Sequence, residues 1–134
     1  MTDQKKAEEA LKEAQLQQRA ILDNIPDIAW LKDRDSRFVM VNESFGRACG
    51  VPPLDLVGKT DLDIWPSELA EGYRAADREV MECGRSKRWE EPLSDSEGNP
   101  HWIETIKTPI FNETGEVIGT AGIARDITER RRAE

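Results

Sequence analysis

Residues 4–23 show a helical repeat of apolar positions. One face carries residues spaced alternately by four and three, a 3.5-residue period: Ala7, Leu11, Ala14, Gln18, Ile21 and Ile25. The segment is almost free of glycine, proline and β-branched residues, so its helix propensity is high, and Pro26 ends it. We call this face the seam. It is weak, because two of its residues are alanines and one is a glutamine. We therefore expect a homodimer helix that associates through Leu11, Ala14, Gln18 and Ile21, or a single helix packed on its own domain.

Two short apolar runs follow the helix. Residues 27–32 place Ile28, Trp30 and Lys32 on one side of a strand, and residues 37–41 form a second run after a polar turn at 33–36. Two such runs joined by four polar residues predict a β-hairpin.

The middle of the chain predicts helices. Asn42 can cap a short helix that stops at Gly50, and brief turns follow around residues 54–57 and 61–65. Pro66 then opens a longer helix and Gly84 closes it. Its apolar stripe recurs at helical spacing: Leu69, Tyr73, Ala76, Val80 and Cys83.

Three strands complete the predicted order, at residues 87–93, 101–111 and 117–126, with polar turns at 94–100 and 112–116. Two strands, short helices, one longer helix and three strands predict an α+β fold: a five-stranded antiparallel sheet with helices on one face. We expect a helix over residues 1–24, a compact domain over 25–126, and the start of a charged helix over 127–134.

The last strand leads into that charged helix without a loop. Gly119, Ala121, Gly122 and Ala124 make the strand thin, as in a central strand beneath bulky neighbours. Asp126 precedes Glu129 by three residues, the spacing of a helix N-cap paired with a reaching carboxylate. A buried strand joined to a solvent-facing helix can carry motion out of a core. The alternative is a last strand with no such role.

Composition narrows the classes of function. The 134 residues are enough for one domain with modest extensions, and the formal charge of −8 argues against nucleic-acid binding and against a polybasic membrane contact. No run approaches the ~20 apolar residues of a membrane span. Cys49 and Cys83 lie far apart, as free, buried thiols in a reducing compartment do. We expect a cytoplasmic domain, with any membrane anchor elsewhere in a parent chain.

Several local motifs resemble the PAS family of sensor domains over residues 17–130. The order of elements matches that fold, and single residues stand where the family places them. These are Asn42 after the second strand, Gly50 and Gly58-Lys59-Thr60 between short helices, Asp77 in the long helix, Glu90-Glu91 on the third strand, Pro109-Ile110 with residues 115–119 in the last hairpin, and Asp126-Ile127-Thr128-Glu129-Arg130 at the end.

The resemblance implies a non-catalytic sensory module. Such domains usually lie inside a histidine kinase, a diguanylate cyclase or phosphodiesterase, or a transcription regulator. They dimerise through an N-terminal helix and pass a signal from the sheet to an output helix. The resemblance assigns this transmission to Asp126, Ile127, Thr128 and Glu129, with Asp126 and Thr128 tying the last strand to the helix. A ligand-free dimerisation or docking domain with a fully packed core is the alternative.

The chemistry of single residues limits the cofactors. His101 is the only histidine and follows a turn, whereas family members that bind haem usually ligate iron from the long helix, which here has no histidine. Cys49 stands in an Arg-Ala-Cys-Gly run, unlike the photoreactive cysteine of the flavin-binding branch. Cys49, Cys83 and His101 show no zinc-ligand spacing, so we expect no metal site. Haem and covalent flavin are both disfavoured, and the cofactor is otherwise unknown.

Aromatic side chains predict a pocket between the sheet and the helices. Its candidate lining is Trp30, Phe45, Tyr73, Met81, Trp102 and Ile123. Large rings can equally fill a small core. No Ser-His-Asp or Cys-His arrangement supports catalysis, and the carboxylates at Asp61, Asp63 and Glu90-Glu91 are expected to be solvated.

Overall fold

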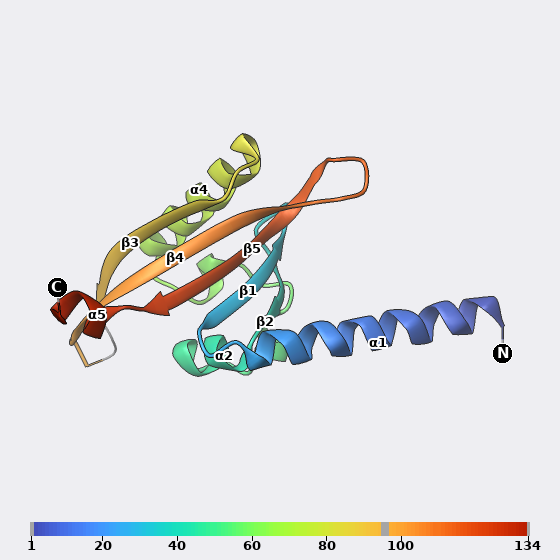
Figure 1. Cartoon of the computed structure of the whole chain (residues 1–134), viewed down its shortest axis with the longest axis horizontal. Coiled ribbons are helices and arrows are strands. Elements are labelled where there is room, and N and C mark those ends of the chain that lie inside the picture. The colour runs from blue at the N-terminus through green and yellow to red at the C-terminus, as the bar shows by residue number, and fades with distance from the viewer. Residues whose placement is uncertain (1, 95–96, 134) are drawn as a thin grey trace.

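The computed structural model describes residues 2–94 and 97–133, and shows one antiparallel sheet with helices on one face (Figure 1). The strands are β1 (Ile28–Asp33), β2 (Phe38–Val41), β3 (Lys87–Ser94), β4 (Pro100–Phe111) and β5 (Val117–Asp126). The helices are α1 (Asp3–Asn24), α2 (Glu43–Cys49), α3 (Pro53–Leu56), α4 (Ser67–Cys83) and α5 (Thr128–Ala133), with a 3₁₀ turn, η1, at Asp61–Asp63. Part of the predicted 94–100 turn lies outside the described residues.

The sheet confirms the predicted α+β fold. Its strand order is β2-β1-β5-β4-β3, and every neighbouring pair is antiparallel. The last strand in the chain, β5, is therefore the central one. Gly122 explains why β5 must be thin, because a Cβ at that position would lie 2.2 Å from Cε2 of Trp30. The indole of Trp30 occupies the space that a side chain on β5 would need.

The two faces of the sheet follow from this contact. Gly122 faces the indole on the helical side, so Ala121 and Ile123 point to the other side, because successive residues of a strand alternate. Their cross-strand partners Leu31 and Ile106 share that outer face.

Helix α2 begins and ends where the sequence predicts, and α4 ends at the predicted glycine. The Oδ1 atom of Asn42 accepts the backbone N–H of Phe45 at 3.0 Å, which caps α2. Gly50 and Gly84 end α2 and α4 in the left-handed conformation, at φ of 75° and 66°.

The buried face of α4 differs from the predicted stripe. Its buried residues are Ala70, Asp77 and Val80, whereas Cys83 is exposed. The prediction that both cysteines are buried is therefore wrong for Cys83 and only partly correct for Cys49, which is half-buried. The helix is turned toward Asp77 because this carboxylate is paired with lysines of the sheet.

Helix α1 extends away from the domain (Figure 1). None of its residues is buried, and Leu11 and Ile21 are 61% and 66% exposed. Only its last turn is tied to the domain, where Nδ2 of Asn42 donates to the carbonyl of Leu22 and Oδ1 of Asp23 accepts the N–H of Glu43. The alternative of a helix packed on its own domain is therefore wrong.

Asn42 links α1, β1 and α2, and we expect its removal to be costly. Its Oδ1 accepts the N–H groups of Ala29 and Phe45, and its Nδ2 donates to the carbonyls of Leu22, Ile25 and Asp27. Asn42→Ala should lower the free energy of unfolding by about 3 kcal/mol, because buried backbone groups lose their partners. Urea denaturation measures this change.

Asn112→Ala is the matched control. The Oδ1 of Asn112 also accepts backbone N–H groups, from Thr114 and Glu116, but the residue is exposed. Its loss should cost less than about 1 kcal/mol, since water replaces the bonds. Equal costs at the two sites would contradict the linking role of Asn42.

Candidate functional site

A cavity of about 110 Å³ lies between the sheet and the helices. Strands supply most of its wall, and α2, η1 and α4 close it on the other side. We call this space the cavity. Its lining is Ile28, Trp30, Lys32, Phe38, Phe45, Asp61, Trp65, Tyr73, Glu91, Ile103, Thr105, Lys107 and Ala124.

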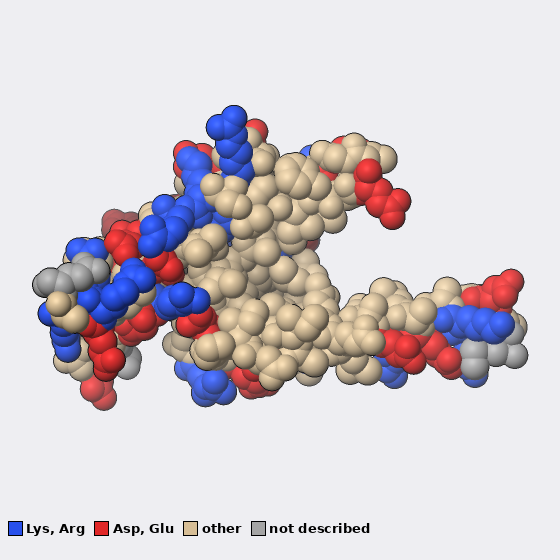
Figure 2. Space-filling view, viewed as in Figure 1, with Lys and Arg blue, Asp and Glu red and all other residues tan. Residues whose placement is uncertain are grey.

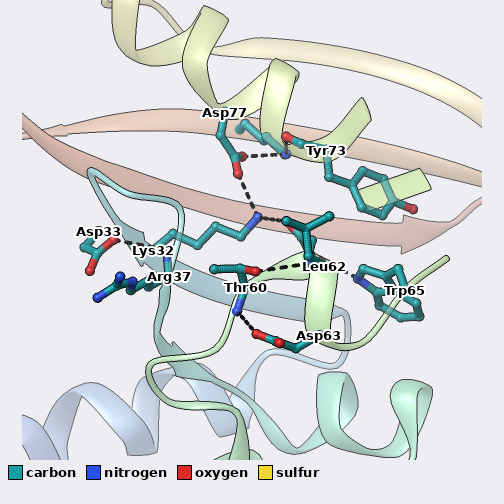
Figure 3. Close-up of polar contacts among 11 residues, drawn as sticks. Lys32, Asp33, Arg37, Thr60, Leu62, Asp63, Trp65, Tyr73 and Asp77 are labelled. Carbon is teal, nitrogen blue, oxygen red and sulfur yellow. Dashed lines mark hydrogen bonds and ion pairs between the residues drawn. The ribbon is translucent and has the colours of Figure 1, made fainter. Parts of the chain in front are cut away.

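Four buried charged side chains lie together beside the cavity. Figure 3 shows two of them, Lys32 and Asp77, pointing toward one another. Lys32 Nζ lies 2.5 Å from Asp61 Oδ2 and 2.8 Å from Asp77 Oδ2, and Lys107 Nζ lies 2.6 Å from Asp77 Oδ1. We call Lys32, Asp61, Asp77 and Lys107 the charge quartet. Each of its side chains is at most 4% exposed. Two ammonium groups and two carboxylates make the quartet neutral.

Local structure positions each member of the quartet. Lys32 and Lys107 point to the helical side of β1 and β4, in line with the other cavity residues on those strands. Asp77 lies on the buried face of α4. Asp61 is presented by η1, which Thr60 and Asp63 hold in a reciprocal capping box.

Burial shifts the ionisation of two groups at this end. The pKa of Lys107 is lowered, chiefly because burial disfavours the ammonium, while Asp77 partly offsets the shift. The pKa of Tyr73 is raised by burial and then by the negative charges of Glu91 and Asp61. The phenol therefore remains neutral and faces a negative field.

Two tryptophans in the cavity wall differ in their hydrogen bonding. Trp65 Nε1 donates to Asp61 Oδ1 at 3.2 Å. Trp30 Nε1 is buried and has no hydrogen-bond partner among the described residues. Trp30 packs edge-on against Phe45, with ring centroids 5.8 Å apart, and its indole lies against Gly122.

At the far end of β5 the chain turns directly into α5. Asp126 Oδ1 accepts the N–H of Thr128 at 2.9 Å and its hydroxyl at 2.5 Å. Thr128 Oγ1 in turn accepts the N–H of Trp102 at 2.9 Å, and the N–H of Ile127 donates to the carbonyl of Trp102 at 2.8 Å. We call residues 126–129 the exit.

Charged contacts surround the exit. The pKa of Asp126 is lowered: burial opposes the shift, but the hydrogen bonds from Thr128 and His101 outweigh it. His101 Nδ1 lies 2.8 Å from Asp126 Oδ2. Arg130 and Arg131 of α5 each pair with Glu90 on β3 at 3.1 Å. Figure 2 shows charged side chains gathered at this end of the molecule, while the middle of the same face carries few.

The structure brings together only part of the predicted pocket. Trp30, Phe45 and Tyr73 line the cavity, whereas Met81, Trp102 and Ile123 lie outside it. Met81 lies with Arg34 and Val117 at a separate surface depression.

Trp102 and Ile123 lie on the outer face, because their strand neighbours Ile103 and Ala124 line the cavity. Trp102 instead stacks against Arg131 of α5, and the Cζ atom of Arg131 lies 3.7 Å from the centroid of the Trp102 ring. Among the residues of β5, only Ala124 lines the cavity. Trp30 covers Gly122 and separates it from the cavity.

Of the four exit residues, Asp126, Ile127 and Thr128 make the bonds that join β5, β4 and α5. The side chain of Glu129 is exposed and makes no hydrogen bond back to Asp126 among the described contacts. The predicted reciprocal cap is therefore one-sided. The first turn of α5 is capped by the carboxylate of Asp126, without a reciprocal bond from Glu129 among the described contacts.

Sequence reasoning missed the charge quartet. Asp61 was expected in a solvated turn but is 3% exposed. One signal was present: Lys32 shares a strand face with Ile28 and Trp30, so a buried lysine needed a carboxylate partner. Which aspartates supply it could not be read from spacing, because the partners lie 29 and 45 residues away.

The described residues contain neither a metal-binding cluster nor a membrane-spanning helix. Within residues 2–94 and 97–133, no group of three or more histidine, cysteine or acidic side chains is placed to hold a metal ion. No helix there has the length and apolar character that crossing a bilayer requires.

Comparisons with known proteins agree with this geometry. A protein-family model described as the PAS fold matches residues 22–132. The chain is 31% identical over 115 residues to the methanogenesis regulatory histidine kinase FilI of Methanothrix harundinacea, covering 86% of this chain and 13% of FilI. It is 30% identical over 111 residues to a diguanylate cyclase of Vibrio cholerae, covering 81% of this chain and 35% of the cyclase.

A solved structure is also similar. The VqmA–ligand–DNA complex from Vibrio cholera superimposes with a TM-score of 0.74 at 28% identity, covering 84% of this chain and 51% of that chain. The chain thus spans about a third or less of the two curated relatives, and about half of the VqmA chain. The DNA in that complex is a partner of VqmA. For the present chain, the absence of nucleic-acid binding stays a prediction.

Breaking the charge quartet should destabilise the fold. We expect Asp77→Asn to lower the free energy of unfolding by about 3 kcal/mol near neutral pH, because it leaves buried ammonium groups short of a counter-charge. The deficit should shrink as pH rises toward the ordinary lysine value of 10.5. Because Asp77 raises the pKa of Lys107, its removal lowers that pKa further in the folded variant than in the wild type. The unfolded chain then binds more protons than the folded variant over a wider range below 10.5, so the stability of the variant rises more with pH.

Glu79→Gln is the control for this substitution. Glu79 pairs with Lys87, and their side chains are 61% and 38% exposed. Exposed pairs contribute at most about 1 kcal/mol. Urea denaturation of both variants across pH measures the difference. A deficit for Asp77→Asn no larger than that for Glu79→Gln would show that the quartet contributes little.

Proposed function

Since the chain belongs to the PAS family, we propose that it is a non-catalytic sensory module of a larger signalling protein. The module senses a small ligand or a partner at the cavity and transmits the event through the exit to an output helix. The relatives are a histidine kinase and a diguanylate cyclase, and an output domain of either kind suits a chain that spans so little of their length.

One observation carries this proposal: β5 connects the cavity to the exit. Ala124 lines the cavity, and Asp126, two residues later, caps α5. The indole of Trp30, a residue of β1, packs against Gly122 of β5. A change in the cavity that moves Trp30 or Ala124 therefore acts on the strand that sets the direction of α5.

The cavity favours sensing over the alternative of a fully packed docking domain. A void of about 110 Å³ with a polar end is space that a packed core would fill with side chains. The VqmA structure that resembles this chain is described as a complex with a ligand. These observations support a small ligand as the signal.

A second copy of the chain is the proposed partner of α1. The helix buries none of its residues, although it carries Leu11 and Ile21 on one seam. Association of two copies through that seam would cover these side chains and align two output helices. We place the assembly in the cytoplasm, with any membrane anchor elsewhere in the parent protein.

Removing the exit cap should uncouple sensing from output. In the full-length signalling protein, Asp126→Ala should abolish most of the signal-dependent change in output. A lost cap costs about 1 kcal/mol, and links of this kind carry only about 1–3 kcal/mol. Hydrogen exchange should show faster exchange in α5, and the output assay reports the coupling.

Asp33→Ala provides the matched control. Asp33 Oδ1 also accepts two backbone N–H groups, from Asp35 and Arg37, but in the β1–β2 turn. This variant should retain the signal-dependent output. If Asp126→Ala retained it equally, transmission through the exit would be wrong.

The dimer proposal can be tested on one helix with two leucines. Leu11 lies on the seam and Leu16 lies off it, and both are 61% exposed. Leu11→Asp should weaken association by about tenfold or more, since burying a leucine contributes about 1.5–3 kcal/mol. Leu16→Asp should leave association unchanged. Sedimentation velocity over a concentration series measures both, and equal effects of the two variants would contradict the seam.

A further inference from the structure

Strand β3 forms an open edge of the sheet. It is the last strand in the order β2-β1-β5-β4-β3, and among the described residues it pairs with β4 alone. In Figure 1, β3 borders the domain on one side, and α1 projects from the opposite side. The open edge of a strand presents backbone N–H and C=O groups that can pair with another strand.

The contacts of Trp102 show which backbone groups of β3 point outward. Trp102 lies opposite Pro92, and its N–H and carbonyl bond to residues 127–128, on the side of β4 away from β3. Pro92 and Trp102 are therefore a non-hydrogen-bonded pair, and such pairs alternate with hydrogen-bonded pairs along an antiparallel ladder. Two and four residues before Pro92, the backbone groups of Glu90 and Arg88 consequently point away from β4.

These outward groups are available for pairing. Among the residues that the structure describes, no hydrogen bond joins the backbone N–H or C=O of Arg88 or Glu90 to another element. Pro92 also faces outward but has no N–H to donate, so it ends the segment that can pair fully. We call residues 87–91 the free edge.

The charges of the free edge complement a second copy of the same edge. Its sequence is lysine, arginine, tryptophan, glutamate, glutamate. When two copies pair antiparallel about Trp89, Lys87 of each copy lies opposite Glu91 of the other. Arg88 of each copy lies opposite Glu90 of the other. Residues directly opposite in an antiparallel pair share a face, and opposite charges at such positions are stabilising.

The same register also joins the outward backbone groups. Arg88 and Glu90 both point outward, so each Arg88–Glu90 pair exchanges two backbone hydrogen bonds across the contact. A shift of register in one direction places Arg88 opposite Arg88, and a shift in the other places Glu90 opposite Glu90. Like charges directly opposite are destabilising. Of these registers, the one about Trp89 satisfies both the charges and the backbone.

Charged residues on an edge strand commonly prevent pairing, because they repel an approaching strand. The free edge lacks that protection, because its four charges sum to zero although the whole chain carries −8. The half-buried Trp89 at its centre would meet its own copy on the two-fold axis, and aromatic cross-strand pairs are stabilising. The composition of this edge therefore favours pairing with itself.

We infer that the free edge is a second contact surface of this protein, and that its partner is another copy of the same chain paired antiparallel about Trp89. The contact uses none of the residues of the α1 seam and goes beyond the proposed function. Two edges of this length form a small contact, and interfaces below about 1,200 Å² are typical of transient complexes. The association is accordingly weak and reversible.

Glu90 connects this contact to the output helix. Its carboxylate accepts hydrogen bonds from Arg130 and Arg131 of α5, both at 3.1 Å. In the paired edges the same carboxylate also faces Arg88 of the second copy. Pairing therefore acts on the ion pairs that hold α5 beside β3.

Charge reversal tests the register. In a Leu11→Asp background, which removes the α1 seam, the chain should still form dimers through the free edge. Arg88→Glu or Glu90→Arg should each weaken this association about tenfold or more, because the opposed side chains then repel. An equimolar mixture of the two variants should recover the association, since each glutamate then faces an arginine. Sedimentation velocity over a concentration series measures all four samples.

Arg78→Glu is the control for net charge. Arg78 is exposed on α4 and borders a depression with Arg34 and Val117, apart from β3. The substitution changes the charge of the chain by the same amount as Arg88→Glu and should leave the association unchanged. Added salt should weaken the association of the parent chain, because its exposed ion pairs are screened.

Amide exchange tests the hydrogen bonds without a substitution in β3. In the same background, the N–H groups of Arg88 and Glu90 should exchange quickly in dilute protein and more slowly as the concentration rises. The N–H groups of Trp89 and Glu91 point to β4 and should be protected at every concentration. NMR measures these rates. They carry the result if Arg88→Glu folds poorly through loss of its ion pair with Glu104.

Three results would overturn the inference. A Leu11→Asp chain that stays monomeric at every concentration would remove the contact. A mixture that associates no better than either charge variant alone would contradict the register, and amide exchange independent of concentration would contradict backbone pairing. The Asp126→Ala test of transmission does not depend on β3, so the proposed function stands or fails separately.

Discussion

Two lysines and two aspartates, buried together between the sheet and the helices, hold the molecule in one arrangement. Lys32 bridges Asp61 of η1 and Asp77 of α4, and Lys107 reaches Asp77 from β4. Desolvation offsets much of the attraction in such a group. Its main effect is geometric, because a buried ammonium must keep its carboxylates, and those carboxylates lie on η1 and α4, which thereby stay attached to β1 and β4.

The cavity lies beside the quartet. The lysines and aspartates occupy one end of the space between the sheet and α4, and the aromatic rings of the core fill the other. Between them remains a small volume bordered by the indole of Trp30. Gly122 and Phe45 pack against the indole of Trp30 and hold the ring in place.

The same strand that supports Trp30 leads out of the domain. β5 lies in the centre of the sheet and pairs with β1 on one side and with β4 on the other. At its end the carboxylate of Asp126 and the hydroxyl of Thr128 join β5, β4 and α5 in one set of bonds. Trp102 serves this junction from the outer face, which explains why a tryptophan predicted in the pocket lies elsewhere.

The sequence by itself determined the elements and their order. Alternation in β1, the caps at Asn42, Gly50 and Gly84, and the small residues of β5 are local signals, and the structure contains each of them. The tertiary structure alone decided which polar residues are buried. Asp61 and Lys107 become part of the quartet only because chain segments 29 to 45 residues apart meet, and spacing along the chain carries no record of that meeting.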